Sequence, residues 1–242
     1  EVDRVTTIMN VVKKQLVDVT GIDPGKVSVV RHGSIDADTF NFYLDKERIE
    51  KKNQVAVLNR HTFHKGVDQS INICRLIKGA LPETRFLFVS DGEEWYTNLL
   101  KRYASQVLGN NAVFTGWVDN PTKIRLLRES KVLLDNEWPI GFGGCVLAEA
   151  IFADCVPICW DTEGKREVTN GLNFRERAYA ELVPKENFEE AASRAVQVLR
   201  GSTMGGKWTP EFFAEGRKWI TENRSVEAHA RGLLTVFEEV VK

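Results

Sequence analysis

The sequence predicts an α/β fold built on a doubly wound, Rossmann-like parallel sheet, and three observations support this. Short runs of apolar and β-branched residues alternate with longer segments of helical periodicity. The short runs are continuously apolar, as strands covered on both faces are. The 242 residues are 43% hydrophobic, which is enough for a sizeable core. Ligands of such sheets bind in the crevice beyond the carboxyl ends of the strands.

The expected elements follow in order along the chain. Residues 1 to about 20 form a strand and a helix, which end at the turn-forming segment GIDPG. Six strands are then expected at residues 27–30, 55–58, 86–89, 112–115, 132–134 and 156–159. Helices are expected at residues 66–79, 93–107, 120–129, 145–153 and 187–199, followed by two closing helices at 210–222 and 225–241. Ser225 is in position to cap the last helix.

Charge and cysteine content argue against several classes of protein. Lysine and arginine (33) nearly balance aspartate and glutamate (34), so no basic surface for nucleic acid or anionic lipid is indicated. The four cysteines lie in apolar stretches without the spacing of a zinc site or a secreted disulfide framework. No apolar stretch approaches the ~18 residues of a membrane span. We therefore expect a cytoplasmic protein, and we interpret the chain, which lacks an initial methionine, as a fragment of a longer one.

A glycine-rich turn precedes one of the expected helices. Gly141, Gly143 and Gly144 let a ligand approach the unpaired N–H groups of the helix start, where an anion can bind. Glu149 lies about one and a half turns into that helix, within reach of both hydroxyls of a vicinal diol. Phosphate and ribose together indicate a nucleotide. The alternative, a tight turn followed by a solvated glutamate, stays open on these residues alone.

Two cations follow the strand expected at residues 55–58. Arg60 and Lys65 lie at a carboxyl end of the sheet and before a helix. A cation at a helix start opposes the helix dipole, so Lys65 is unfavourable there unless it faces an anion. A guanidinium and an ammonium that converge on a diphosphate would supply that partner.

Six segments carry a family resemblance, and they occur in the family's order. They are VSVVRHGSIDADTF, VAVLNRHTFHKGVDQSI, FLFVSDGEEW, AVFTGWVDNPTK, GFGGCVLAEA and TEGKREVTNGLNF. Together they resemble the C-terminal, donor-binding half of GT-B glycosyltransferases, in particular the retaining nucleotide-sugar enzymes of family 4. The similarity covers residues 27 to about 240. Residues 1–20 resemble the last strand and helix of the family's N-terminal domain.

The resemblance implies a role for each matching residue. Arg60 and Lys65 would hold the diphosphate and act in catalysis, and Glu149 would bind the ribose. The other implied substrate contacts are Val118 and Lys123 near the base, the backbone of Gly143, Gly144 and Cys145 at the sugar and distal phosphate, and Gly141, Phe142 and Glu137 beside them.

The sequence also departs from the family's pattern. The family's first glutamate, eight residues before Glu149, is replaced by Gly141. Glu137 is either its substitute or a surface acid. Ser90 stands where the family has the first glycine of Gly-Asp-Gly, and Asp154 lies near the glycine that follows the acidic helix.

Asp36-Ala37-Asp38 is the D-x-D pattern with which the other large class of glycosyltransferases holds a metal-bound sugar nucleotide. Two acids at this spacing also occur by chance in turns, and no histidine completes a metal-ligand spacing. We therefore expect no metal site and no other cofactor.

The family resemblance implies a hexosyltransferase. A sugar would pass with retention from a UDP- or GDP-type sugar nucleotide to an acceptor hydroxyl. Residues 1–24 would be the trailing strand and helix of an acceptor domain or a linker, and residues 25–242 the donor-binding domain. The acceptor, a glycan, lipid or protein, would be bound by an N-terminal domain absent from this chain, and membrane attachment would come from parts outside it.

Two alternatives come from other classes of protein. A GT-B half that has lost turnover would be a sugar-nucleotide binding or assembly module. A GT-B relative with another reaction would be a sugar-nucleotide epimerase or a sugar phosphorylase, although the cofactor lysine signal of phosphorylases is absent.

Overall fold

A six-stranded parallel sheet forms the centre of the molecule, which confirms the predicted fold class. The computed structural model describes residues 3–44, 49–137, 144–170, 178–205 and 207–241. The strand order is β5-β4-β3-β6-β7-β8. The strands are β3 (Lys52–Val57), β4 (Arg85–Val89), β5 (Ala112–Gly116), β6 (Ser130–Asp135), β7 (Val156–Trp160) and β8 (Glu181–Val183). The chain winds outward from β3 in one direction and from β6 in the other, so the topological switch point lies between these two strands.

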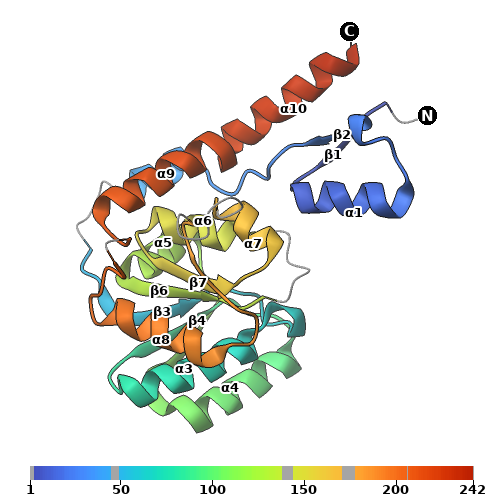
Figure 1. Ribbon diagram of the computed structural model, residues 1–242. Coiled ribbons are helices and arrows are strands. Elements are labelled where there is room, and N and C mark those ends of the chain that lie inside the picture. The colour runs from blue at the N-terminus through green and yellow to red at the C-terminus, as the bar shows by residue number, and fades with distance from the viewer. Residues whose placement is uncertain (1–2, 45–48, 138–143, 171–177, 206, 242) are drawn as a thin grey trace.

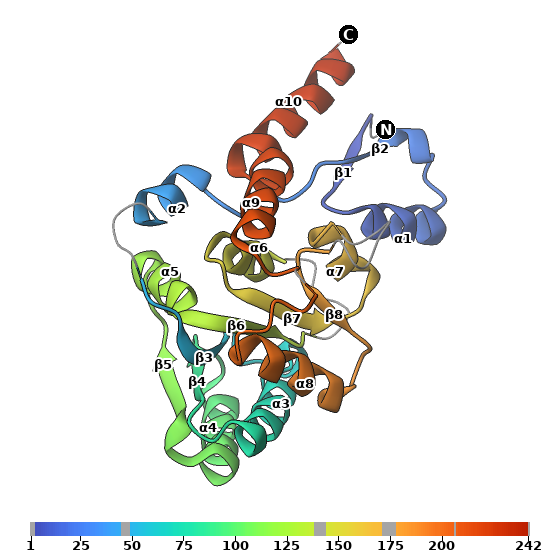
Figure 2. The ribbon, with the colours of Figure 1, turned by 60° about the vertical axis from the view of Figure 1, so that its left-hand side comes forward.

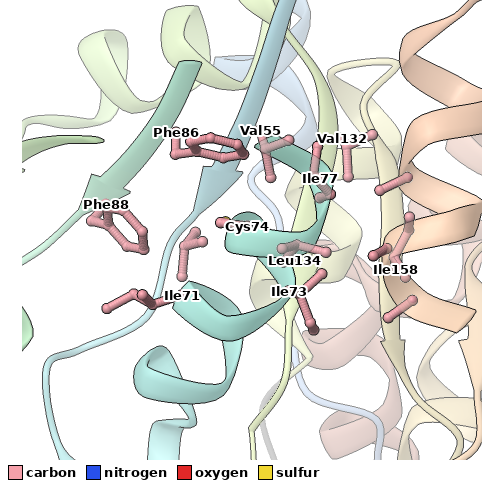
Figure 3. Packing of buried hydrophobic residues seen from close by; sticks show 14 of the residues in the cluster. Val55, Ile71, Ile73, Cys74, Ile77, Phe86, Phe88, Val132, Leu134 and Ile158 are labelled. Carbon is pink, nitrogen blue, oxygen red and sulfur yellow. The ribbon is translucent and has the colours of Figure 1, made fainter. Parts of the chain in front are cut away.

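Alternate side chains of each strand enter two separate cores, because successive residues point to opposite faces. Val55 and Val57 of β3 pack in one core, whereas Ala56 packs in the other. Figure 3 shows the first core, where Ile71 and Ile77 of the neighbouring helix lie beneath the strands. Burial on both faces explains why the strands are apolar throughout instead of alternating with polar residues.

Helices cover both faces of the sheet (Figure 1). One layer holds α3 (Val67–Ala80), α4 (Glu94–Leu108) and α8 (Phe188–Leu199), and the other holds α5 (Asn120–Glu129), α6 (Cys145–Phe152) and α7 (Glu163–Val168). Helix α9 (Pro210–Arg224) packs on α6, and α10 (Val226–Val241) extends away from the sheet (Figure 2). All seven helices expected between residue 66 and residue 241 are present. Ser225 caps α10, since its hydroxyl accepts from the amide of Ala228 at 3.0 Å.

The N-terminal piece differs from the prediction. Strands β1 (Val5–Thr7) and β2 (Val27–Val29) form a separate parallel pair, and α1 (Asn10–Thr20) connects them. The expectation that residues 27–30 begin the main sheet is therefore wrong, because this strand pairs with β1. The boundary after residue 24 stays a prediction, and it falls between two paired strands. The far end of α10 reaches this sheet, where Arg4 and Glu239 form an ion pair at 3.3 Å.

Three short elements were not predicted: α2 (Ala37–Leu44), α7 and β8. Helix α7 has only six residues, and most of them are polar. Strand β8 is three residues long at the edge of the sheet. It begins with a buried carboxylate, Glu181, which binds the indole N–H of Trp208 at 2.9 Å and the ammonium of Lys207 at 3.1 Å. These partners, distant in the sequence, make a charged residue acceptable in a buried strand.

Two residues at or near glycine positions of the family adopt glycine-like backbone angles. Ser90, directly after β4, has a φ of 130°, and Asp154, after α6, has a φ of 53°. The left-handed region is costly for residues with a Cβ atom. Both positions thus have a glycine-like backbone although neither residue is a glycine.

Gly66 lies against the backbone that follows β6, so closely that no side chain fits. Its φ is +62°, and a Cβ atom here would lie 2.1 Å from the carbonyl oxygen of Asn136. We expect Gly66→Ala to lower the free energy of unfolding by more than about 2 kcal/mol, because left-handed strain and displacement of the backbone after β6 add together.

Gly79 is the matched control, since it lies in α3, which begins next to Gly66, and a Cβ atom added to it would have nothing within 4 Å. Gly79→Ala should raise the free energy of unfolding by about 1 kcal/mol through helix propensity. Urea denaturation followed by circular dichroism measures both variants. Equal stability of Gly66→Ala and the parent protein would contradict this close contact.

Candidate functional site

Polar side chains gather at the switch point of the sheet. Asn59 follows β3, and Asp135 is the last residue of β6; both are buried. The amide of Asn59 donates to the carboxylate of Asp135 at 3.1 Å. The two central strands are therefore tied together by side chains where the crevice opens.

Lys165 provides the counter-charge for Asp135. It comes from α7, is 4% exposed, and its ammonium donates to the Asp135 carboxylate. Burial alone would raise the pKa of Asp135, but Lys165 and the bond from Asn59 hold it below its ordinary value. Burial likewise opposes the charge on Lys165, while Asp135 raises the pKa of this lysine. Both groups are thus charged at neutral pH.

Asn59, Asp135 and Lys165 were not predicted from the sequence. A signal was present, because Asp135 ends a strand of otherwise apolar residues and a buried carboxylate requires a partner. Which lysine would supply it could not be read from the sequence.

Glu137 connects this pair to Lys65. It is 4% exposed, so the interpretation as a surface acid is wrong. Its carboxylate accepts a hydrogen bond from the ammonium of Lys65 and lies 3.9 Å from that of Lys165. We refer to Asn59, Lys65, Asp135, Glu137 and Lys165 as the switch-point network. Its two lysines and two carboxylates balance in charge.

The loops at this edge approach one another closely. A Cβ atom on Gly92 would lie 2.2 Å from the carbonyl oxygen of His61, and the His61 amide donates to the carbonyl of Asp91 at 2.9 Å. The His61 ring contacts the Thr97 hydroxyl at 3.2 Å, and burial lowers the pKa of this histidine. His61 thus joins the loops after β3 and β4 and has a structural role.

Lys123 and Glu149 form a second ion pair, at 2.6 Å, from α5 and α6. They line a pocket of about 160 Å³, together with Ser34, Asp36 and Asn120 among others. Glu149 is 8% exposed. Burial raises its pKa, and Lys123 partly counteracts this. The pocket lies at the start of α5 and therefore on the carboxyl side of the sheet.

The structure joins some predicted site residues and leaves others apart. In the described part of the chain, Lys65 pairs with Glu137 and Lys123 with Glu149, whereas neither Arg60 nor Val118 has a hydrogen bond or ion pair with another predicted site residue. Arg60 is exposed, and Val118 packs against the second core. Gly141, Phe142 and Gly143 lie outside the described residues.

The last residues of the glycine-rich turn have a packing role. Gly144 has a φ of +57°, and a Cβ atom on it would lie 2.3 Å from a methyl carbon of Val168. The close contact between the start of α6 and α7 therefore requires a glycine here. The neighbouring Cys145 thiol lies 3.7 Å from Nδ1 of His32.

Asp36 of the D-x-D pattern caps a helix. Its carboxylate accepts from the amide of Thr39 at 3.0 Å and from its hydroxyl at 2.6 Å, at the start of α2. Asp38 is exposed in the first turn of α2. Within the described ranges, no group of three or more histidine, cysteine, aspartate or glutamate side chains is arranged to hold a metal ion.

Comparison with solved structures shows the same fold in proteins of low sequence identity. A glycosyltransferase from Rickettsia africae has a TM-score of 0.77 at 19% identity, with 99% of this chain and 64% of that chain covered. HepE from Anabaena, in complex with UDP and glucose, has a TM-score of 0.75 at 15% identity, with 98% and 63% covered. TarM from S. aureus, in complex with UDP and other ligands, has a TM-score of 0.72 at 13% identity.

The chain spans only part of the length of these proteins. The match with TarM includes 97% of this chain but 44% of TarM. No curated protein matches it significantly. Among the helices in the described residues, none combines the length and apolarity needed to cross a bilayer. The family profile described as "Glycosyl transferases group 1" matches residues 40–204, which is more than half of the 242 residues. The chain therefore belongs to the group 1 glycosyl transferases, and its fold matches that of GT-B glycosyltransferases of solved structure.

Proposed function

We propose that this chain is the donor-binding part of a retaining, family 4 type hexosyltransferase that uses a UDP or GDP sugar. The observation that carries the proposal is the pair of lysine–carboxylate contacts at the carboxyl side of the sheet, Lys65–Glu137 and Lys123–Glu149. In each pair, the lysine can bind an anionic group of a ligand, and the carboxylate can accept hydrogen bonds from hydroxyl groups. A nucleoside-diphosphate sugar offers both kinds of group.

Arg60 and Lys65 would bind the diphosphate. The switch-point network is neutral as a whole, so the exposed Arg60 adds the net positive charge. Lys65 can exchange its carboxylate partner for a phosphate oxygen, because its side chain is 27% exposed. Positioned cations of this kind stabilise charge that grows on a leaving diphosphate, and loss of one such donor in other enzymes costs about 3 to 4 kcal/mol.

Glu149 would accept the two ribose hydroxyls, with Lys123 keeping its carboxylate ionised. Val118 and Lys123 would lie near the base, and the turn at Gly141, Phe142, Gly143, Gly144 and Cys145 near the sugar and distal phosphate. The neighbours HepE and TarM, whose structures hold UDP, support a uridine nucleotide as the first donor to test.

Transfer with retention requires the acceptor hydroxyl to attack the same face of the sugar from which the diphosphate leaves. The attacking group would be positioned by a further domain, since the chain spans 44% to 64% of the length of these similar solved structures. The acceptor would be a glycan, lipid or protein. Neither a metal ion nor another cofactor is needed in this proposal, since the cations are side chains.

A sugar-nucleotide binding module without turnover is the second candidate. Gly141 replaces the family's first glutamate, and Glu137 is already bound by two lysines. This candidate shares donor binding with the first and differs in the absence of transfer when the complete protein is supplied with an acceptor.

Arg60→Ala and Lys65→Ala should each weaken binding of a UDP or GDP sugar by about 10- to 100-fold, since each removes a charge-assisted hydrogen bond worth roughly 1.5–3 kcal/mol. Calorimetric titration of the 242-residue chain measures this. Arg85→Ala is the matched control, because Arg85 is an exposed arginine at the opposite end of β4. Unchanged affinity in both crevice variants would refute the diphosphate site.

Donor binding should weaken as pH falls through the raised pKa of Glu149, at a pH above the ordinary glutamate value of 4.5. Affinity falls with pH because only the ionised carboxylate accepts hydrogen bonds from both ribose hydroxyls, and burial favours its neutral form. Titrations with a UDP sugar avoid the phosphate titration of UDP itself. Glu149→Gln should bind more weakly at pH 7 and lose this pH dependence, and a parallel profile in both proteins would remove Glu149 from the site.

EDTA should leave donor binding unchanged. Asp38→Ala should likewise leave donor affinity unchanged, because Asp38 is exposed and does not line the pocket of Lys123 and Glu149. Asp36→Ala should lower the free energy of unfolding by about 1 kcal/mol through loss of the α2 cap. Calorimetry measures the affinities and thermal unfolding the stability. Loss of binding both in EDTA and in Asp38→Ala would instead support a metal-bound donor at Asp36 and Asp38.

A further inference from the structure

Two arginines outside the predicted donor contacts have buried N–H groups without partners. Arg224, the last residue of α9, is 1% exposed. Its Nε and Nη2 atoms are buried and have no hydrogen-bond partner in the described part of the protein, and the same holds for Nε of Arg31. Buried polar groups are nearly always paired, so three such donors on two neighbouring cations require an explanation.

The acid that acts on this pair has other partners. Glu167 lies close enough to act on the charge of Arg224. Its carboxylate oxygens, however, accept from the amide of Asn10 at 2.9 Å and from its side chain at 2.8 Å, at the start of α1. Arg31 donates to the side-chain oxygen of Asn223 at 3.3 Å, and this amide carries no charge. Burial and the repulsion from Arg31 lower the pKa of Arg224 to about 10.

The arginine pair lies beside the start of α6: Arg31 is on the segment that connects β2 to α2, and Arg224 ends α9. The amide of Ser34 donates to the carbonyl of Arg224 at 2.7 Å. Next to Arg31 in the chain, His32 contacts the thiol of Cys145, the first residue of α6, at 3.7 Å. Cys145 is also among the groups that act on the charge of Arg224. The N–H groups of the α6 start therefore add to the positive potential of the arginines.

We propose that Arg31 and Arg224, beside the start of α6, bind a phosphate group of the acceptor, separate from the donor diphosphate. The identity of the ligand as an acceptor rests on the proposed function, but the anion site itself does not. A phosphate carries a charge near −2 and offers three oxygens, which match two guanidinium charges and three unpartnered N–H groups. Arg31 is half-buried, so part of this residue reaches solvent. The start of α6 follows the turn assigned to the sugar, which places this phosphate at the sugar end of the donor and away from the base.

The first test separates this site from the donor site. In the Arg60→Ala/Lys65→Ala double variant of the chain, inorganic phosphate and glycerol 3-phosphate are titrated by calorimetry and by ³¹P NMR. Both ligands should still bind. Arg31→Gln in that background should weaken both at least tenfold, whereas Arg217→Gln should not, since Arg217 is on α9 but pairs with Asp154 at the surface.

The donor measurement distinguishes the two proposals. Arg31→Gln alone should keep its affinity for a UDP sugar within about twofold. Loss of phosphate binding in the double variant, or unchanged phosphate affinity in Arg31→Gln, would overturn the second site while leaving the proposed donor site intact. Tighter binding of glycerol 3-phosphate than of inorganic phosphate supports an acceptor ester, and binding of inorganic phosphate alone overturns the acceptor assignment.

Arg224→Met provides an independent check. It replaces the arginine by a long apolar side chain and so introduces no new polar group into the buried site. Phosphate should raise the unfolding temperature of the parent chain, and this rise should disappear in Arg224→Met. An equal rise in both proteins contradicts the proposal. If Arg224→Met does not fold, the Arg31→Gln titration decides alone.

Discussion

The buried ion pair between Asp135 and Lys165 connects the fold to the site. Asp135 ends the central strand β6, where the sheet changes winding direction, and a carboxylate buried there is unstable without a cation. Lys165 supplies it from α7, and Asn59, just beyond the neighbouring strand β3, completes the contact. The position of α7 is thus fixed relative to the crevice, and Glu137 is held two residues beyond Asp135, where Lys65 reaches it.

Close backbone contacts fix the positions of the loops. Gly66 lies against the segment that follows β6, Gly92 lies against the segment that follows β3, and Gly144 contacts α7. Ser90 and Asp154 keep glycine-like angles without being glycine, so their strain must be offset by the packing around them. The loops at the carboxyl end of the sheet are therefore held by backbone contacts that tolerate little change.

The sequence predicted the parts of this structure that depend on local pattern. Apolar runs and helical periodicity located five of the six strands of the main sheet and the seven helices beyond residue 66. The pairing of β2 with β1 could not be read in this way, because both strands are three residues long and similar to a strand of the main sheet. Lys65, Lys123 and Glu149 were predicted, but their carboxylate and lysine partners depend on contacts between distant segments. Lys165, Arg31 and Arg224 were missed for the same reason: a lysine or arginine in a polar segment carries no sign that it will be buried.

The contrast between the lysines and the arginines of this protein bears on what the crevice can bind. Lys65, Lys123 and Lys165 each have a carboxylate partner, so an anion that approaches Lys65 or Lys123 must compete with an existing contact. This competition favours a ligand that brings several groups at once, as a nucleotide sugar does with phosphates and hydroxyls. Arg31 and Arg224 hold unpartnered N–H groups within the described residues, and there an anion would relieve an unfavourable charge instead of displacing a favourable one. A simple phosphate can therefore suffice at the arginines, whereas the lysines require a ligand that satisfies both members of each pair.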